Sequence, residues 1–254
     1  LWSAANLAAT AGSDMDMESY LYVKHLKNLV DEGKVSIDKI EDAVRRILRV
    51  KYELGLFDDP YKYCDEEREK TVIGSDKNME IALDMAKKSI VLLKNENRLL
   101  PLKKEGLKIA VIGPLADDKN SPLGGWRLAA DDNTAVSVME GLKKYKGNAL
   151  SYQKGVEFVK GEQAFVFELD INTTDKSGIS EAVEVAKAND VVVMVLGEHG
   201  YQTGEGRSRA SLDLPGLQQE LLEAVQAVNK NIVLVLMNGR PLTINWADEN
   251  VPAI

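Results

Sequence analysis

The sequence predicts an α/β protein in which a short helical segment precedes an open, mostly parallel α/β sandwich. Two observations support this fold class. Short apolar runs that end in or near glycine have the composition of buried parallel strands. Segments with helical spacing separate these runs, and a strand–helix–strand order builds a parallel sheet covered by helices. The runs are residues 108–113, 149–155, 190–197 and 231–239, and the clearest helical segments between them are 179–188 and 217–228.

The helical segment covers residues 1–57 and contains a pair of amphipathic helices. Ser36 is expected to cap the second helix, and Gly55 to end it. The first helix of the pair runs from about residue 18 to 30 and ends at Gly33. No strand accompanies either helix, so we expect both to pack on residues outside this chain. The apolar face of the second helix consists of Ile37, Ile40, Val44, Ile47 and Leu48.

Residues 58–77 are predicted to be a linker, and residues 78–254 the sandwich. The linker contains Asp58-Asp59-Pro60 and a charged run at 65–70 that has no apolar period. The last residues, 251–254, are apolar and partly β-branched, which is typical of a strand that is just beginning. Together with the missing initiator methionine, this predicts a piece of a larger protein whose sandwich is incomplete at the C-terminus.

Composition narrows the chemistry. The 254 residues are 44% hydrophobic and 28% charged, which is enough to bury a core, and no apolar run approaches a membrane span. A net charge of −8 makes nucleic acid an unexpected partner. One cysteine, Cys64, excludes an internal disulfide, and two histidines leave little for a zinc site or a catalytic triad. Any chemistry must therefore rest on carboxylates.

Ligands of open α/β sheets gather at the carboxyl ends of the strands, which directs attention to the loops after Gly113 and Gly197. The second loop contains Glu198, Glu205 and Arg209, and glycines on both sides of Glu205 would let its side chain swing into a cleft. This pattern allows a catalytic carboxylate. It equally allows a solvated loop in which Glu198 and Arg209 form an ion pair.

The loop after Gly113 carries Trp126 directly behind two glycines. Its ring could present a flat face to a sugar, or it could pack under its own loop. A dinucleotide site fits poorly, because no G-x-G-x-x-G follows the strand and Pro114 removes a backbone amide. Asp14 and Asp16 are spaced like metal ligands, but the further ligands of a calcium loop are absent.

Six segments, in order along the chain, resemble glycoside hydrolase family 3, in particular its periplasmic bacterial β-glucosidases. Each segment alone is a weak signal, whereas six in the same order are specific, and they cover nearly the whole chain. The segments are Ala11–Met17, Arg49–Tyr61, Lys88–Asn95 with Leu100–Leu102, Lys108–Asp117, Gly197–Pro215 and Val235–Pro241.

The resemblance implies a (β/α)8 barrel followed by an α/β sandwich, with the active site between the two. Residues 1–57 would then be the end of the barrel. The family's nucleophilic aspartate would lie upstream of the position that matches Leu1. Asp14 and Asp16 are not assigned this role, because the family places its Gly-x-Asp-Met motif downstream of the nucleophile.

The resemblance also implies the site residues. Glu205 matches the family's acid/base carboxylate, and Trp126 is similar to the aromatic wall of the subsite for the leaving sugar. Met17 would line the floor of the pocket. Glu198 and Arg209 match positions that would shape the Glu205 loop.

The implied function is part of a retaining, exo-acting β-glucosidase, with water as acceptor and neither a cofactor nor a metal. Such an enzyme needs two carboxylates roughly 5 Å apart. Because the resemblance places the nucleophile outside this chain, the chain alone should be nearly inactive. The expected partners are β-glucosides or oligosaccharides and the barrel of the same enzyme; a homodimer stays open, and no membrane is expected. The resemblance implies a periplasmic or secreted location. A β-xylosidase, an N-acetylglucosaminidase and a non-catalytic carbohydrate-binding module are the alternatives.

Overall fold

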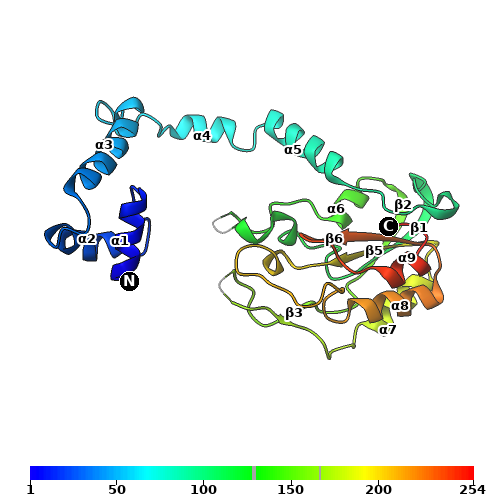
Figure 1. The fold of residues 1–254 in the computed structure, drawn as a ribbon. Coiled ribbons are helices and arrows are strands. Elements are labelled where there is room, and N and C mark those ends of the chain that lie inside the picture. Colours follow the sequence, from blue (N-terminus) through cyan, green and yellow to red (C-terminus); the bar gives the residue numbers. More distant parts are fainter. Residues whose placement is uncertain (128–129, 166) are drawn as a thin grey trace. The chain divides into compact units, whose positions relative to one another are not determined.

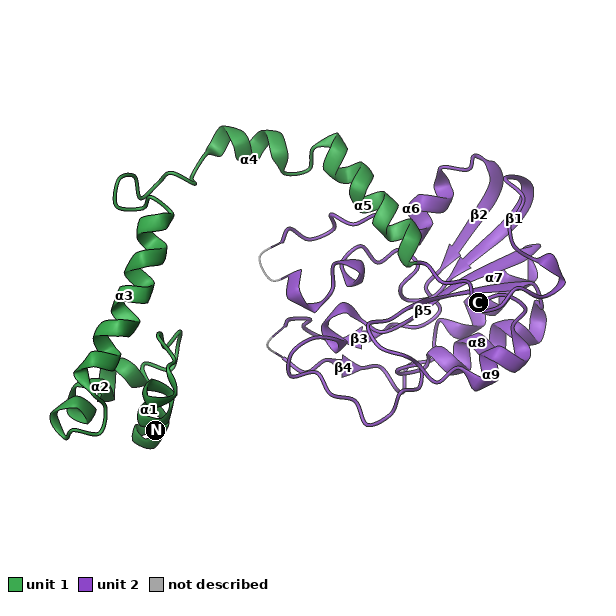
Figure 2. Cartoon of the chain, turned by 45° about the horizontal axis from the view of Figure 1, so that its top comes forward, with its two compact units in different colours: residues 1–89 green, residues 90–254 purple. Residues whose placement is uncertain are grey.

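A computed structural model describes residues 1–127, 130–165 and 167–254. It divides into two compact units, residues 1–89 and 90–254, shown in different colours in Figure 2. The first unit contains helices, and the second contains the sheets (Figure 1). The helices are α1 (Trp2–Ala11), α2 (Leu21–Asp31), α3 (Ile37–Glu53), α4 (Glu66–Val72), α5 (Asp76–Ser89), α6 (Val138–Lys143), α7 (Ile179–Lys187), α8 (Gln218–Val228) and α9 (Asn245–Asn250). The strands are β1 (Glu105–Ile112), β2 (Gly147–Gln153), β3 (Val159–Lys160), β4 (Asp170–Ile171), β5 (Val191–Gly197) and β6 (Ile232–Met237).

The predicted pair of amphipathic helices is present as α2 and α3. Ser36 caps α3, since its hydroxyl accepts a hydrogen bond from the amide of Asp38 at 3.2 Å. A small core forms between α1, α2 and the start of α3, but much of the apolar face of α3 is exposed. The exposed apolar side chains of α3 include Ile37, Val44 and Leu48, whereas Ala5, Ala9, Leu29 and Val35 are buried in the core.

The predicted linker contains a helix, α4. This helix was not predicted, because its sequence has no apolar period. Asp65 caps this helix by accepting a hydrogen bond from the amide of Arg68 at 2.8 Å. The acidic residues of the first turn lie at the positive end of the helix dipole, so α4 is favoured without an apolar face. The compact units divide at 89/90, and the predicted boundary at 77/78 stays a prediction.

The second unit is built on a parallel four-stranded sheet with the order β2-β1-β5-β6. All four predicted strands are present, and the predicted α/β sandwich is confirmed. Every residue of β5 is buried, as expected for a central strand of a parallel sheet. The antiparallel pair of β3 and β4, two residues each, was not predicted because segments this short have no periodicity.

Alternate residues of the strands feed two separate cores, one on each face of the sheet. One core joins the sheet to α7, α8 and α9, and the other joins it to α6 and β3. The first contains Ile112, Met194, Leu196, Leu221 and Leu222, and the second contains Ile109, Val111, Val193, Val195 and Met139. The sheet is thus covered on both faces, and only its edges and ends are open to ligands.

Residues 251–254, predicted to begin a strand, form no strand of their own and pair with the chain only through isolated bridges and a few further hydrogen bonds. Ala253 bridges Val233 in the parallel sense and Asn95 in the antiparallel sense. Further hydrogen bonds join Ile254 to Leu93 and Lys94, at 2.9 to 3.1 Å.

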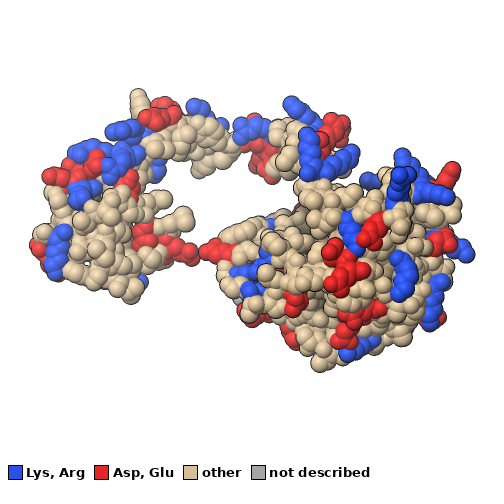
Figure 3. Space-filling view, turned by 45° about the vertical axis from the view of Figure 1, so that its right-hand side comes forward, with Lys and Arg blue, Asp and Glu red and all other residues tan. Residues whose placement is uncertain are grey.

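Acidic and basic side chains are interspersed on the face drawn in Figure 3. In the described part of the chain, no helix has both the length and the apolar character needed to cross a membrane.

We expect Gly197→Ala to destabilise the sheet by roughly 3–5 kcal/mol. Gly197 has a φ of +140°, and a Cβ there would overlap the carbonyl oxygen of Met237 on β6. Gly161→Ala is the matched control, since its φ of +71° is also left-handed but its surroundings are open. The control should lose only about 1–2 kcal/mol. Hydrogen exchange of the β5 amides measures both effects, and equal losses in the two variants would contradict the close approach at Gly197.

Candidate active site

Loops that follow β1, β5 and β6 meet at the carboxyl edge of the sheet. In the sheet, β1 has β2 as its neighbour on one side and β5 on the other, so the chain leaves β1 and β5 in opposite directions. Their carboxyl ends therefore form a topological switch point, where α/β proteins bind ligands. The amide of Gly200 donates a hydrogen bond to Oγ of Ser121 at 3.0 Å, which joins the first two loops. A cavity of about 260 Å³ lies among the three loops, lined by residues that include Glu198, His199 and Asn238.

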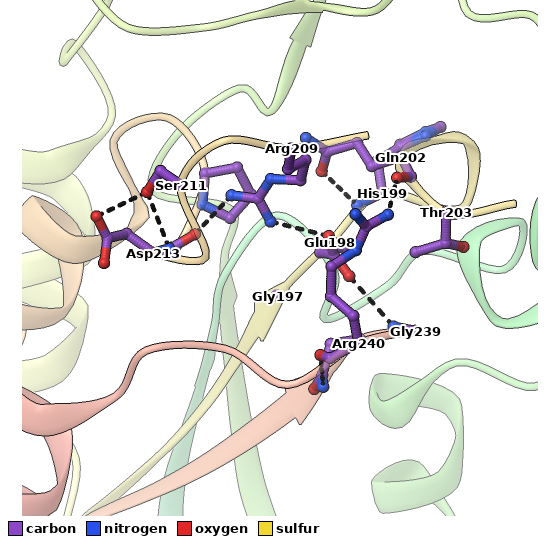
Figure 4. A network of polar contacts seen from close by, with 12 residues as sticks. Gly197, Glu198, His199, Gln202, Thr203, Arg209, Ser211, Asp213, Gly239 and Arg240 are labelled. Carbon is purple, nitrogen blue, oxygen red and sulfur yellow. Dashed lines mark hydrogen bonds and ion pairs between the residues drawn. The ribbon is translucent and has the colours of Figure 1, made fainter. Parts of the chain in front are cut away.

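Glu198 lies at the centre of this edge, directly after β5, and its side chain is only 1% exposed. Figure 4 shows its carboxylate between Arg209 and Arg240. Oε1 accepts a hydrogen bond from Nη1 of Arg209 at 2.8 Å, and Oε2 accepts one from the amide of Gly239 at 3.2 Å. The Glu198–Arg209 ion pair is therefore present, but it is buried rather than solvated. Because little water screens the two charges, their attraction is stronger than at a surface.

Arg240 is the second cation of this network, and its role was not predicted. Its Nε lies 3.0 Å from Oε1 of Glu198, without an aligned hydrogen bond to any described residue. Its Nη2 donates to the carbonyl oxygens of Gln202 at 2.6 Å and Arg207 at 3.2 Å. Only the loops after Gly113 and Gly197 were predicted to carry ligands. Asn238-Gly239-Arg240 follows a third strand at the same edge, and that position was the available signal.

Glu205 is exposed, at the tip of the loop that Arg240 contacts. It lies between Gly204 and Gly206, whose φ values of +117° and +70° are both left-handed. The amide of Arg207 donates to the carbonyl of Gly204 at 3.2 Å and closes a turn around Glu205. The glycine pattern seen in the sequence therefore forms a tight turn that presents one carboxylate to solvent.

Trp126 lies beside this turn and is 59% exposed. Its ring is 5.5 Å from that of Phe165, at 45°. A Cβ placed on Gly204 would lie 3.7 Å from Nε1 of Trp126, so the indole adjoins the backbone next to Glu205. The tryptophan is thus only partly packed, and more than half of its surface is open to solvent.

An aromatic cluster continues from Trp126 through Phe165 to the loop after β5. The ring of Tyr201 lies 6.4 Å from Phe165 and 5.6 Å from His199. The guanidinium of Arg127 lies over Tyr201, 5.0 Å from the ring centre. This cluster was not predicted, because its residues come from several loops far apart in the sequence.

His199 is buried and neutral within this cluster. Its Nδ1 accepts a hydrogen bond from the amide of Tyr201 at 3.2 Å, so Nε2 carries the proton and donates to Oε1 of Gln163 at 3.0 Å. Burial lowers the pKa of His199 below its ordinary value, because the charged ring would lose its hydration.

Met17 lies in the first unit, between α1 and α2, and is 88% exposed. Asp16 holds this segment by accepting hydrogen bonds from the hydroxyl of Ser19 at 2.8 Å and from its amide at 3.1 Å. The hydroxyl contact is the largest cause of the lowered pKa of Asp16.

Asp14, two residues earlier, is bound by Arg46 of α3. Nε and Nη2 of the guanidinium donate to its two oxygens at 2.7 and 2.6 Å. This bidentate contact lowers the pKa of Asp14. Asp16 thus holds its local backbone, and Asp14 joins this segment to α3.

Metal chemistry has no evident ligand set in residues 1–127, 130–165 and 167–254: no group of three His, Cys, Asp or Glu side chains could hold an ion.

The fold and the loops define an α/β domain that presents a carboxylate and an aromatic ring at its switch point, a combination suited to carbohydrate chemistry. Residues 90–254 match the family model described as the glycosyl hydrolase family 3 C-terminal domain. The chain therefore belongs to glycoside hydrolase family 3.

Relatives of this chain are considerably longer than it is. It is 39% identical to a periplasmic β-glucosidase of Salmonella typhimurium, with 99% of the chain and 34% of the relative aligned. It is also 39% identical to a β-xylosidase of Formosa agariphila, over 99% of the chain and 35% of the relative. A crystal structure of a mutant β-glucosidase from Listeria innocua in complex with laminaribiose superimposes with a TM-score of 0.85 at 33% identity, over 99% of this chain and 32% of that one. The chain thus spans about a third of the length of these relatives.

We expect the imidazole of His199 to titrate below about pH 6.5, the ordinary pKa of histidine. Just below this pH, the imidazole is protonated in the unfolded chain and neutral in the folded chain. The stability contributed by the neutral ring is complete above this pH and is lost as the pH falls below it. For one proton the slope is at most about 1.4 kcal/mol per pH unit.

Proton–nitrogen correlation spectra of the chain's two imidazoles measure this titration, with His25→Gln to assign the signals. His199→Asn keeps an acceptor for the amide of Tyr201 and should lose this part of the pH dependence. A titration midpoint at or above 6.5 would contradict the buried neutral ring.

Proposed function

We propose that this chain is the part of a retaining, exo-acting β-glucosidase that supplies the acid/base carboxylate, Glu205, and the aromatic wall for the leaving sugar, Trp126. The observation that carries the proposal is the exposed turn at Gly204–Gly206, which holds Glu205 next to the exposed indole. Family membership supports glycosidic bond hydrolysis as the reaction. Met17 is proposed to line the pocket from the barrel side.

The proposed reaction has two steps. In the first, Glu205 protonates the oxygen of the leaving sugar while a nucleophilic aspartate attacks the anomeric carbon. In the second, Glu205 removes a proton from water as the water attacks the anomeric carbon. The bond to the aspartate breaks, and the sugar is released with retained configuration. We propose that the nucleophile lies in a barrel outside these residues, roughly 5 Å from Glu205 in the assembled enzyme.

Exposure suits Glu205 to this role. A carboxylate that must reach a glycosidic oxygen needs free space in front of it, and its neighbours Gly204 and Gly206 add no side chains there. The apolar face of Trp126 can stack on a sugar ring, whose C–H groups pack well on an aromatic surface. We propose no cofactor for this chemistry.

A β-xylosidase is the second candidate, because a relative of that name is as similar to the chain as the periplasmic β-glucosidase. The two sugars differ by one hydroxymethyl group, so comparing kcat/KM on aryl β-glucosides and aryl β-xylosides decides between them. By the same likeness, we propose a periplasmic or secreted location. A protein without hydrolytic activity that still binds β-glucosides would instead be a carbohydrate-binding module.

Glu205→Ala, made in a protein that includes the barrel, is expected to lower kcat/KM on cellobiose roughly 10²–10⁴-fold, since the leaving oxygen loses its proton donor. An aryl glucoside with a nitrophenolate leaving group needs no proton and should be affected much less. The glycosyl-enzyme should accumulate and give a burst. Azide needs no general base, so it should restore turnover and yield the β-glycosyl azide.

Glu249→Ala, at an exposed position on α9, is the matched control and should leave both substrates unaffected. Near wild-type cleavage of cellobiose by Glu205→Ala would show that Glu205 is only a loop carboxylate. An α-configured azide product would mean that the missing group was the nucleophile.

Trp126→Ala in the same protein should raise KM for disaccharides about tenfold and change kcat little. A stacked sugar is stabilised by about 1–2 kcal/mol in both the ground state and the transition state. Trp126→Phe keeps a flat ring and should recover most of the loss. If KM is unchanged in Trp126→Ala, the indole packs on Phe165 and the loop alone.

A further inference from the structure

The turn that carries Glu205 has little support of its own. Two left-handed glycines flank the carboxylate, and glycine permits many backbone conformations. A general acid, in contrast, must sit within hydrogen-bond reach of one oxygen of the substrate. The position of Glu205 must therefore be set by contacts at the two ends of the turn.

Arg240 makes a contact at each end of the turn, and the side chain of Arg207 is also bound to the carbonyl oxygens of Phe165 and Phe167. One nitrogen, Nη2, donates to the carbonyl oxygen of Gln202 at 2.6 Å and to that of Arg207 at 3.2 Å. The two carbonyls bracket Glu205 in the sequence, three residues before it and two after it. A single guanidinium from the loop after β6 thus closes the base of the turn that follows β5.

Glu198 in turn holds Arg240. Its carboxylate lies 3.0 Å from Nε of Arg240, and it also binds Arg209 and the amide of Gly239, the neighbour of Arg240 (Figure 4). Since Glu198 directly follows the buried strand β5 and is itself buried, it is fixed relative to the sheet. The contacts run without interruption from the sheet to Glu198, from Glu198 to Arg240, and from Arg240 to both ends of the turn.

We infer that Arg240 is a positioning residue that sets where the Glu205 carboxyl lies, acting through the backbone of residues 202–207. The inference rests on the proposed role of Glu205 as acid/base. Loosening the turn should impair proton transfer to the leaving oxygen while leaving attack by the nucleophile intact. A displacement of about 1 Å in a catalytic group can cost up to roughly 100-fold in rate.

The test uses Arg240→Met in the protein that includes the barrel, with kcat/KM measured on cellobiose and on 2,4-dinitrophenyl β-glucoside. For both substrates kcat/KM reports the steps up to the glycosyl-enzyme, but only cellobiose needs a proton for departure. We expect the ratio of the two values to fall about 10- to 100-fold. Arg98→Met, at an exposed arginine of the same unit, is the control and should leave the ratio unchanged.

Arg240→Lys and hydrogen exchange keep the test decisive if Arg240→Met does not fold. Lysine retains the charge beside Glu198 but lacks the planar fork, so the ratio should still fall several-fold. The amides of residues 203–207 should exchange faster in either variant, and those of β5 should not. A role in folding alone would lower both kcat/KM values together, and this result, like an unchanged ratio in the lysine variant, would overturn the inference.

Glu205→Ala, measured in parallel, separates the two proposals. If it lowers the ratio and the Arg240 variants do not, the positioning role fails and the acid/base role stands. If Glu205→Ala leaves the ratio unchanged, the acid/base role fails and the inference about Arg240 fails with it.

Discussion

A buried carboxylate holds the carboxyl edge of this sheet together. Glu198 has lost almost all contact with water, and a charge in that position is tolerated only when it is paired and hydrogen-bonded. Two guanidinium groups and a backbone amide surround it: Arg209 comes from the same loop, whereas Arg240 and the amide of Gly239 come from the loop after β6. The electrostatic demand of one side chain thus fixes the relative positions of the loops after β5 and β6. The loop after β1 is joined to the same assembly through Ser121 and Gly200.

The sheet makes this arrangement possible. Because β5 is a central strand covered on both faces, Glu198, the first residue after it, lies between the ends of the neighbouring strands. Gly197 lets the backbone pass close to Met237 at this point, where any side chain would collide. The polar network therefore begins directly where the apolar core ends, and the rigid core determines where the charged groups lie.

Much of this organisation is predictable from local sequence. Buried strands are recognisable as apolar runs. Ser36 marks the start of α3, because its cap involves only a residue two positions away. The short helix α6, which was not predicted, also has a local signal in the capping box of Ser137 and Glu140. The site was predictable only in part. The Glu198–Arg209 pair lies within one loop and could be anticipated, whereas its burial depends on packing from both faces of the sheet. The role of Arg240 depends on a contact across 42 residues of sequence, from Glu198, which no local pattern encodes.

The bridge that Arg240 makes between Gln202 and Arg207 also bears on how such a loop can evolve. Its anchors are backbone carbonyls, so the side chains between them are not needed to hold the ends together. For a flexible segment with fixed ends, the entropic cost grows only slowly with length, by about 0.6 kcal/mol for each doubling. Insertions and substitutions between the anchors would therefore leave the sheet nearly undisturbed. The architecture separates the part of the chain that must stay constant for folding from the part whose sequence and length can vary.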